Sequence, residues 1–339
     1  MERCYVCREC LGVSHASYPR MCPDCGAKNL EQRERVVDLS GRTALITGGR
    51  VKIGYQTALR MLRCGATVVA TSRFPHSTLA RYQQEPDHDH WADRLHVYGL
   101  DLLRIDLLRS FVERIYQSFD SLDILVNNAA QTVKDEEDVR QQLELEQRHA
   151  RRELTGASIV HELPHPPTDK QVVVAGSIVL DDEQTNAWMM RSGDVTIKEL
   201  LETQIINVTG PFLLSTALRS LLEASPHTNR FLINVSSMEG KFDIKDKSPA
   251  HPHTNMAKAA LNMMTKTFAR EFRRSGISVY SVDPGWVSNQ YPGERPTRRQ
   301  LPLTLEDAAA RITHPVFTWK DVHKPPTGLF LKDYEPTAW

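Results

Sequence analysis

Five of the six cysteines in this chain of 339 residues stand within its first 25 positions, and their spacing is that of a metal site. Cys22 and Cys25 enclose a Pro-Asp pair and precede a glycine, the form of a zinc knuckle, in which two thiolates grip one ion above a tight turn. The partner pair is either Cys4 with Cys7 or Cys7 with Cys10, and either choice gives a tetrahedral site of four thiolates. We favour the first pair, so the predicted zinc ligands are Cys4, Cys7, Cys22 and Cys25.

The N-terminal segment leaves further ligands and a rival interpretation. Cys10 and His15 remain spare ligands, and the rival interpretation is a redox dithiol, which no thioredoxin-like strand before the motif supports. A closed site of four thiolates has no open position for a substrate, so this zinc ribbon is expected to stabilise the chain or to dock a protein partner. Its charges are mixed and no basic stripe accompanies it, so we do not expect it to bind nucleic acid.

From Thr43 onward the pattern changes to one of alternating strands and helices. Residues 43–47 form a short apolar strand, 48–54 a glycine-bearing turn, the next segment a helical pattern ending at Gly65, and 68–72 a second strand. In such a unit, glycine lets the backbone approach a pyrophosphate while the helix N-terminus supplies oriented N–H groups. The predicted fold class is therefore α/β: a Rossmann-type doubly wound parallel sheet with a small N-terminal zinc ribbon.

The chain divides into two unequal parts. We expect the zinc ribbon in residues 1–37 and an NAD(P)-binding Rossmann domain in 38–339, with an insertion at about 131–190. The formal net charge is zero, and no apolar run approaches the roughly 20 residues of a membrane span. The first residues form no apolar signal-peptide core, so we expect a cytoplasmic protein with no membrane partner.

Several short motifs occur in an order that resembles the short-chain dehydrogenase/reductase family. Singly, each could be a turn or a strand cap, but their common order and spacing is typical of that family. The motifs are Thr-Gly-x-x-x-Lys-Ile-Gly at 47–54, Leu-Asp-Leu at 100–102, Asn-Asn-Ala-Ala at 127–130, Asn207, Ser-Ser-x-x-Gly at 236–240, Asp-Pro-Gly at 283–285 and Thr-Gly-Leu at 327–329.

The resemblance, together with basic residues near the glycine turn, predicts where a nicotinamide cofactor binds. Arg73 follows the second strand, where an acid would grip the ribose of NAD, and an arginine suits the extra phosphate of NADP. NADP is therefore the favoured cofactor and NAD the alternative; the rival interpretation is that Arg73 only faces solvent. Lys52 replaces the middle glycine of the family's turn, so its side chain must point away from the pyrophosphate or reach a phosphate. The predicted cofactor-binding residues are Gly48, Arg50, Lys52, Ile53, Gly54, Arg73, Asp101, Asn128, Lys258, Pro284 and Gly285.

The resemblance also implies a catalytic group, and here the chain departs from the family. Asn207, Ser237 and Lys258 match the residues that orient water, substrate oxygen and ribose. The family's tyrosine, one helical turn before the lysine, is Thr254, whose hydroxyl is too weak an acid to replace a phenol near neutral pH.

Two histidines precede the threonine and could supply the proton. His251 stands seven residues before the lysine, the spacing of the tyrosine in the related enoyl reductases, and histidine has a pKa suited to proton transfer. His253 is the second candidate. The rival interpretation is that both histidines brace the turn at Pro252.

The sequence therefore predicts an NAD(P)(H)-dependent oxidoreductase that acts on a small carbonyl, alcohol or enoyl substrate. Its expected partners are that small molecule, a protein at the zinc ribbon and further copies of the same chain in a homo-oligomer. Because the tyrosine is missing, the alternative is a non-catalytic NADP-binding scaffold or redox sensor. Such a scaffold would dock partners through the ribbon or the insertion.

Overall fold

The predicted parallel sheet is present, with nine strands among the residues that this computed structural model describes, 2–130, 159–161, 190–244, 247–287 and 301–339. Their spatial order is β5-β3-β2-β1-β4-β6-β7-β8-β9, and all neighbours are parallel except β9, which runs antiparallel to β8. The strands are β1 Thr43–Thr47, β2 Thr67–Ser72, β3 Leu95–Gly99, β4 Ile124–Asn127, β5 Ile159–His161, β6 Arg230–Val235, β7 Ile277–Asp283, β8 Leu329–Lys332 and β9 Glu335–Thr337.

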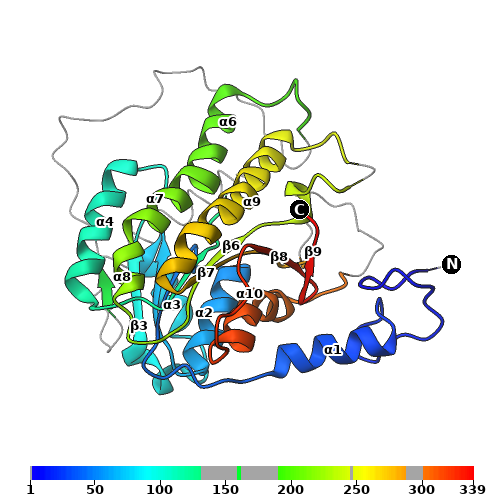
Figure 1. Ribbon diagram of the computed structural model, residues 1–339, viewed down its shortest axis with the longest axis horizontal. Coiled ribbons are helices and arrows are strands. Elements are labelled where there is room, and N and C mark those ends of the chain that lie inside the picture. The colour runs from blue at the N-terminus through cyan, green and yellow to red at the C-terminus, as the bar shows by residue number, and fades with distance from the viewer. Residues whose placement is uncertain (1, 131–158, 162–189, 245–246, 288–300) are drawn as a thin grey trace.

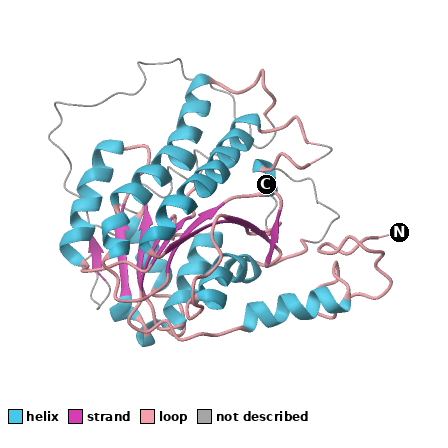
Figure 2. Cartoon of the chain, in the orientation of Figure 1, coloured by secondary structure: helices cyan, strands magenta, loops and turns pink. Residues whose placement is uncertain are grey.

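Helices cover both faces of the sheet (Figure 2), so the predicted doubly wound α/β fold is confirmed. Side chains of α2, α3 and α10 pack on one face, and those of α4, α7, α8 and α9 pack on the other. The helices are α1 Pro23–Glu34, α2 Lys52–Arg63, α3 Pro75–Tyr82, α4 Ile105–Ser118, α6 Ile197–Gln204, α7 Gly210–Ala217, α8 Arg219–Glu223, α9 Pro252–Phe272 and α10 Leu305–Trp319. Apart from 159–161 and Met190, the predicted insertion lies outside the described residues.

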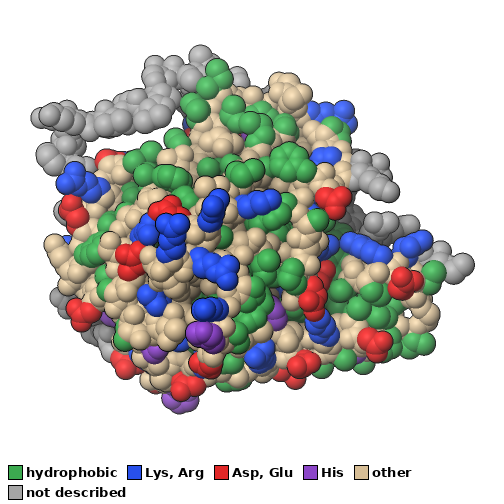
Figure 3. All heavy atoms as spheres, viewed as in Figure 1, with side chains coloured by type: hydrophobic (Ala, Val, Ile, Leu, Met, Phe, Trp, Pro, Cys, Tyr) green, Lys and Arg blue, Asp and Glu red, His purple; other side chains and the backbone are tan. Residues whose placement is uncertain are grey.

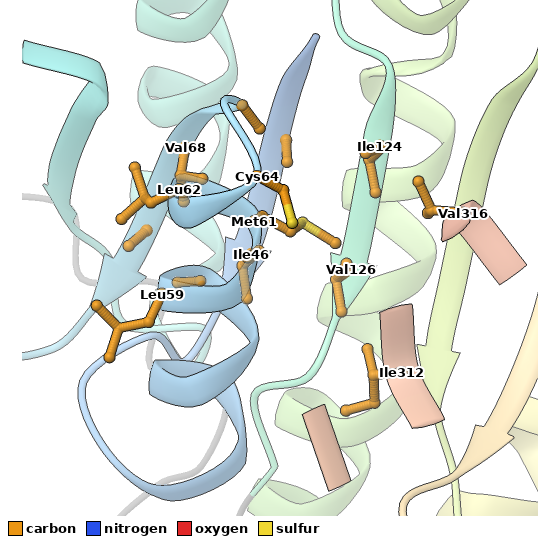
Figure 4. Packing of buried hydrophobic residues seen from close by; sticks show 14 of the residues in the cluster. Ile46, Leu59, Met61, Leu62, Cys64, Val68, Ile124, Val126, Ile312 and Val316 are labelled. Atoms are coloured by element: carbon orange, nitrogen blue, oxygen red, sulfur yellow. The ribbon is translucent and has the colours of Figure 1, made fainter. Parts of the chain in front are cut away.

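The core explains why the central strands are continuous apolar runs. Figure 4 shows Leu59 and Leu62 of α2 beside Ile46 of β1 and Val68 of β2. Ile312 of α10 belongs to the same buried cluster. A parallel strand covered by helices on both faces must be apolar on both faces, which removes the alternation of a half-exposed strand. The helices thereby hold the carboxyl ends of β1, β4, β6 and β7 at one edge of the sheet.

The strand order reverses between β1 and β4, and this reversal sets where a ligand can bind. The chain builds outward from β1 through β2 to β3 and then returns to place β4 on the other side of β1. In open α/β sheets, ligands bind at the carboxyl ends of the strands beside such a reversal. The glycine turn follows β1 and the paired asparagines stand at the end of β4, so both stand at this position.

The N-terminal segment and α1 lie beside α10 and the C-terminal strands (Figure 1). The polar run at 31–35, predicted as a linker or a short helix, largely continues α1, whose first position is Pro23. Arg60 of α2 fastens the end of that helix by donating 2.8 Å hydrogen bonds to the carbonyls of Gln32 and Arg35. Within the described residues, no helix is long and apolar enough to cross a membrane.

Candidate functional site

The glycine turn after β1 has the close backbone packing that a pyrophosphate site needs. Gly48 has φ +71°, and a Cβ atom on Gly54 would lie 2.2 Å from the Gly48 carbonyl oxygen, so neither position accepts a larger residue without strain. The side-chain amide of Asn128 donates to the carbonyls of Thr47 at 2.9 Å and Gly48 at 3.2 Å. Asn128 thus braces the turn, and a direct contact with the cofactor stays a prediction.

Lys52 and Ile53 occupy the start of α2. Lys52 has φ +52°, in the left-handed region where glycine is favoured, and its side chain is exposed. A glycine would adopt this backbone conformation without strain. Ile53 is half-buried against the hydrophobic core, so its role as a cofactor contact stays a prediction.

The two predicted arginines each lie against the same aromatic ring, that of Phe74, just after β2. The guanidinium carbons of Arg50 and Arg73 lie 5.1 and 5.4 Å from the centroid of the Phe74 ring. Two cations held on one ring, next to the glycine turn, form a site suited to a phosphate group. Asp101, beyond β3, accepts a 3.0 Å hydrogen bond from the Leu103 amide and is half-buried.

Lys258 lies deep beside the carboxyl end of β6. Its ammonium group donates a 2.8 Å hydrogen bond to the Val235 carbonyl, and burial lowers its pKa to about 8. A Cβ atom on Gly240 would lie 2.6 Å from the Lys258 carbonyl carbon, so the turn after β6 abuts α9 at this lysine. The structure therefore brings the predicted serine segment and the predicted lysine together.

Ser237 and Asn207 stand on two other elements. The Ser237 hydroxyl accepts a 3.2 Å hydrogen bond from the Glu239 amide and opens the short turn Met238–Gly240. Asn207 is fully buried in a π-helical turn, Ile205–Thr209, that links α6 to α7. Such turns are rare and occur often at functional sites.

Pro284 and Gly285 follow β7, the neighbour of β6. Gly285 has φ +83° and donates a 3.0 Å backbone hydrogen bond to the Asp283 carboxylate. That carboxylate is buried, which raises its pKa. Because β6 and β7 are parallel and adjacent, the Pro-Gly turn and the serine turn leave the sheet at the same edge.

A row of buried polar side chains along α9, missed by the sequence analysis, supports the serine turn. The Asn262 side-chain oxygen accepts a 2.7 Å hydrogen bond from the Ser236 hydroxyl, and its nitrogen donates to the Gly240 carbonyl at 3.0 Å. Thr265 accepts a 2.8 Å hydrogen bond from Asn234 of β6. Together with Lys258, these residues recur at helical spacing, the signal that could have identified them.

His251 is buried against the serine turn. Its Nε2 atom lies 3.4 Å from Oε2 of Glu239, the second residue after Ser237. The approach of His251 is the main cause that lowers the pKa of Glu239 to about 2, with Lys247 contributing. Sequence analysis missed Glu239, although an acid two positions after the candidate serine was the available signal.

His253 and Thr254 stand in a different environment. The Nε2 atom of His253 lies 4.0 Å from the Glu199 carboxylate on α6, and burial lowers the pKa of this histidine. The Thr254 hydroxyl is buried and has no hydrogen-bond partner among the described residues. Of the two histidines, His251 is thus the one paired with the turn that carries Ser237.

The four cysteines predicted as zinc ligands come together. The sulfurs of Cys4, Cys7, Cys22 and Cys25 all lie within 4.8 Å of one another, and the Cys7 and Cys22 sulfurs are 3.9 Å apart. A tetrahedral zinc site with bonds of about 2.3 Å has sulfur–sulfur edges of about 3.8 Å, so the arrangement fits such an ion. Cys10 is exposed and is not among the four clustered residues.

Comparisons with known proteins agree with this geometry. A profile described as short chain dehydrogenase matches residues 42–158, and one described as enoyl-(acyl carrier protein) reductase matches residues 184–312. An uncharacterized protein of Acanthamoeba polyphaga mimivirus is 34% identical over 94% of this chain and 72% of its own length. Human retinol dehydrogenase 13 is 24% identical over 73% of this chain and 59% of its own length.

Solved structures share the fold at low sequence identity. A short chain dehydrogenase from Burkholderia cenocepacia in complex with NADP has a TM-score of 0.59 and 20% identity, covering 86% of this chain and 96% of that one. The NADPH bound carbonyl reductase from chicken fatty liver has a TM-score of 0.57 and 19% identity, covering 89% of this chain and 100% of that one. On its sheet order, its site geometry and these matches, the chain belongs to the short-chain dehydrogenase/reductase family of oxidoreductases.

Proposed function

We propose that the protein is an NADP(H)-dependent oxidoreductase that acts on a small carbonyl, alcohol or activated alkene. The observation that carries the proposal is the buried Lys258, held at the carboxyl end of β6 beside the turn of Ser237. An ammonium group that burial disfavours needs a functional or structural reason to be there, and strongly perturbed lysines are typical of functional sites. The only hydrogen bond described for its ammonium group is to a carbonyl, which leaves donor capacity for a ligand.

The residues around the glycine turn fit a nicotinamide dinucleotide. Gly48 and Gly54 allow the pyrophosphate to approach the backbone at the start of α2, and Arg50 and Arg73 would hold the adenosine phosphate. When bound, the cofactor supplies the hydride. Pro284, Gly285 and Lys258 would orient its other end at the shared edge of β6 and β7.

The chain's own residues would bind the substrate and the ribose and would transfer the proton. Ser237 would hold the substrate oxygen by hydrogen bonding, Lys258 the ribose, and Asn207 an ordered water. Thr254 cannot transfer a proton near neutral pH, because an alcohol is far too weak an acid. We assign the proton to His251, since its imidazole is buried and paired with the acid that follows Ser237.

Because the family's tyrosine is missing, a second function is also proposed. The Thr254 hydroxyl is buried with no hydrogen-bond partner among the described residues, and this favours a cofactor-binding scaffold or redox sensor. The discriminating experiment combines NADPH and NADH titrations with a screen of carbonyl and enoyl substrates for NADPH oxidation. Binding without any turnover across the screen would favour the scaffold, and an absence of binding would contradict both functions.

We also propose that the protein assembles with copies of itself in the cytoplasm. Figure 3 shows hydrophobic side chains gathered over α6, α7 and α9, and Ile197, Phe212, Met256 and Met263 are exposed there by 62, 45, 57 and 61%. Exposed apolar faces of this kind mark interfaces. The cytoplasmic location rests on the clustered cysteines, which favour metal over disulfides in a reducing compartment. A mass of one chain by light scattering at micromolar concentration would contradict the assembly.

Replacing Arg73 with alanine is expected to weaken NADPH binding roughly tenfold or more and to leave NADH binding nearly unchanged. A charge-assisted arginine–phosphate contact contributes about 1.5–3 kcal/mol, and NADH lacks that phosphate. Calorimetric titration of both cofactors measures the difference. Arg81→Ala is the matched control, because Arg81 also stacks on an aromatic ring, that of Tyr55, on an exposed part of α3. Equal affinities of the unmodified protein for NADPH and NADH would overturn the assignment.

NADPH affinity is expected to fall several-fold as pH rises from 7 to 9.5. With a pKa of about 8, Lys258 loses its charge in this range, and a neutral amine holds ribose hydroxyls and phosphates less strongly. The pKa of Lys258 in the folded chain lies below that of an unfolded lysine, so between these two pKa values the unfolded chain binds more protons. Raising the pH through this range therefore increases the free energy of unfolding. Weaker binding therefore cannot be attributed to unfolding through Lys258. Lys258→Met should bind NADPH weakly at every pH; a variant with the same pH profile as the unmodified protein would refute this.

A further inference from the structure

A hydrogen bond joins the segment that follows β7 to the N-terminal ribbon. The Trp286 backbone amide donates to the Tyr5 hydroxyl at 2.9 Å, across 281 positions of sequence. Tyr5 is buried and follows directly on Cys4, one of the four clustered cysteines. The residues predicted to hold the cofactor's nicotinamide end, Pro284 and Gly285, immediately precede this tryptophan.

The ribbon end of this connection is itself held in place. The Tyr5 amide donates to the Arg20 carbonyl at 2.8 Å, and the Cys22 amide donates to the Cys4 sulfur at 3.3 Å. The Arg20 guanidinium also lies over the Trp286 ring, 5.3 Å from its centroid. Both halves of the four-cysteine cluster are therefore linked to the same tryptophan.

The turn is closely packed against Leu303 and the Tyr5 side chain of the ribbon. A Cβ atom on Gly285 would lie 2.4 Å from a methyl carbon of Leu303 and 3.2 Å from the Tyr5 hydroxyl. Leu303 and Val287 share one buried apolar cluster with Cys4. A shift of Tyr5 would therefore act directly on the backbone of this turn, since its hydroxyl contacts both the Trp286 amide and Gly285.

A second anchor joins the ribbon to α10 and does not involve the turn. The Tyr18 hydroxyl donates to the Asp307 carboxylate at 2.7 Å, and the Asn29 side chain donates to the same oxygen at 2.9 Å. Asp307 also closes the capping box at the start of α10 with Thr304. The ribbon thus has one anchor on the site and one on the scaffold, and the two can be broken separately.

We propose that the metal ribbon is a positioning element for the site, acting through Tyr5 on the turn after β7. A metal held by the four cysteines would fix Cys4 relative to Cys22 and Cys25, and α1 and Tyr18 fix that pair relative to α10. Tyr5 then holds the Trp286 amide, and with it the Pro-Gly turn. Loss of the metal releases Tyr5 and loosens the turn. The consequence for cofactor affinity rests on the proposed function, whereas the coupling of ribbon to turn does not.

The test uses amide hydrogen exchange at Trp286, which requires neither cofactor nor substrate. Tyr5→Phe keeps the ring and removes the acceptor, so exchange at this amide should rise roughly fivefold, the equivalent of one net hydrogen bond. Tyr18→Phe is the matched control: it loses a tyrosine hydrogen bond of the same ribbon but should leave Trp286 exchange unchanged. Zinc content is measured for both variants, because loss of the metal would imitate the effect. In the unmodified chain, a zinc chelator should accelerate the same amide.

A parallel NADPH titration separates this inference from the proposed function. We expect three- to tenfold weaker binding for Tyr5→Phe and unchanged binding for Tyr18→Phe. If the unmodified chain binds no NADPH but Trp286 exchange still rises in Tyr5→Phe, the proposed function is wrong and the coupling stands. Unchanged exchange in Tyr5→Phe overturns the coupling whether or not NADPH binds. Equal acceleration in both variants also overturns it, because the ribbon would then only stabilise the chain in general.

Discussion

Replacing His251 with alanine is expected to lower turnover by roughly 10²–10⁴-fold, the usual share of general acid–base catalysis, with cofactor affinity nearly unchanged. Thr254 cannot supply the proton, and His251 is buried 3.4 Å from the acid that follows the candidate serine by two positions. A carboxylate that holds an imidazole in one orientation is a common arrangement for a histidine that transfers protons. The measurement is steady-state turnover with a substrate found in the NADPH oxidation screen.

The backbone conformation of His251 determines which substitution is a suitable control. The residue has φ +45°, where alanine is strained and asparagine is tolerated. His251→Asn keeps the backbone conformation before Pro252 but has no titratable group. Both variants should lose turnover, and the melting temperature should fall more for alanine. Full turnover of His251→Asn would mean that the histidine only braces the turn.

Two further variants identify the donor. Thr254→Ala should be mild, because the hydroxyl makes no hydrogen bond among the described residues. His253→Ala should lower stability more than turnover, since this side chain is buried against α6 and faces Glu199. If His253→Ala abolishes turnover in a protein that stays folded and binds NADPH, the proton belongs to His253.

Features that depend on local pattern were predictable from the sequence. The strand–turn–helix unit identified the sheet because parallel strands covered on both faces are apolar runs separated by helical periods. The spacing of four cysteines identified the cluster that the structure brings together. The same holds for Arg50 and Arg73, which stand in the glycine turn and after the second strand and both lie against the Phe74 ring.

Pairings across the fold could not be predicted in this way. Glu239 meets His251, and Tyr5 meets Trp286, through contacts that depend on how whole elements pack. Residue type and spacing specify an element and its buried face, but they do not specify which side chain it faces. The run at 31–35 shows the same limit: it lacks apolar periodicity, and hydrogen bonds from Arg60 fasten its end as part of α1. Propensity is a weak guide where tertiary contacts decide.

The position of the ribbon also changes the interpretation of its function. On sequence alone, it was expected either to stabilise the chain or to dock a protein partner. In the structure, its apolar residues Cys4, Tyr18 and Met21 are buried against the loop after β7 and α10. Docking of a separate protein stays a prediction, and what the contacts support directly is stabilisation.

Removal of the zinc ligands is therefore expected to destabilise the whole protein. Purified protein should contain about one zinc per chain. Cys22→Ser combined with Cys25→Ser should abolish zinc binding and lower the free energy of unfolding by about 4 kcal/mol, because loss of a bound metal is one of the few changes that destabilise a protein this strongly. The physical reason is that a released ribbon exposes the buried Tyr18 and Met21 and leaves the Asp307 carboxylate without its hydrogen bond from Tyr18.

Metal analysis and urea unfolding under reducing conditions measure the two effects, and Cys10→Ser is the matched control. Cys10 is exposed and is not among the clustered residues, so its replacement should leave both zinc content and stability unchanged. Substoichiometric zinc in the unmodified protein under metal-replete conditions, with no other metal bound, would contradict the site. Normal stability in a zinc-free double variant would show instead that the contacts with α10 hold the ribbon without any metal. The metal could then not govern the turn at Trp286, because a ribbon that keeps its fold without zinc also keeps Tyr5 in place.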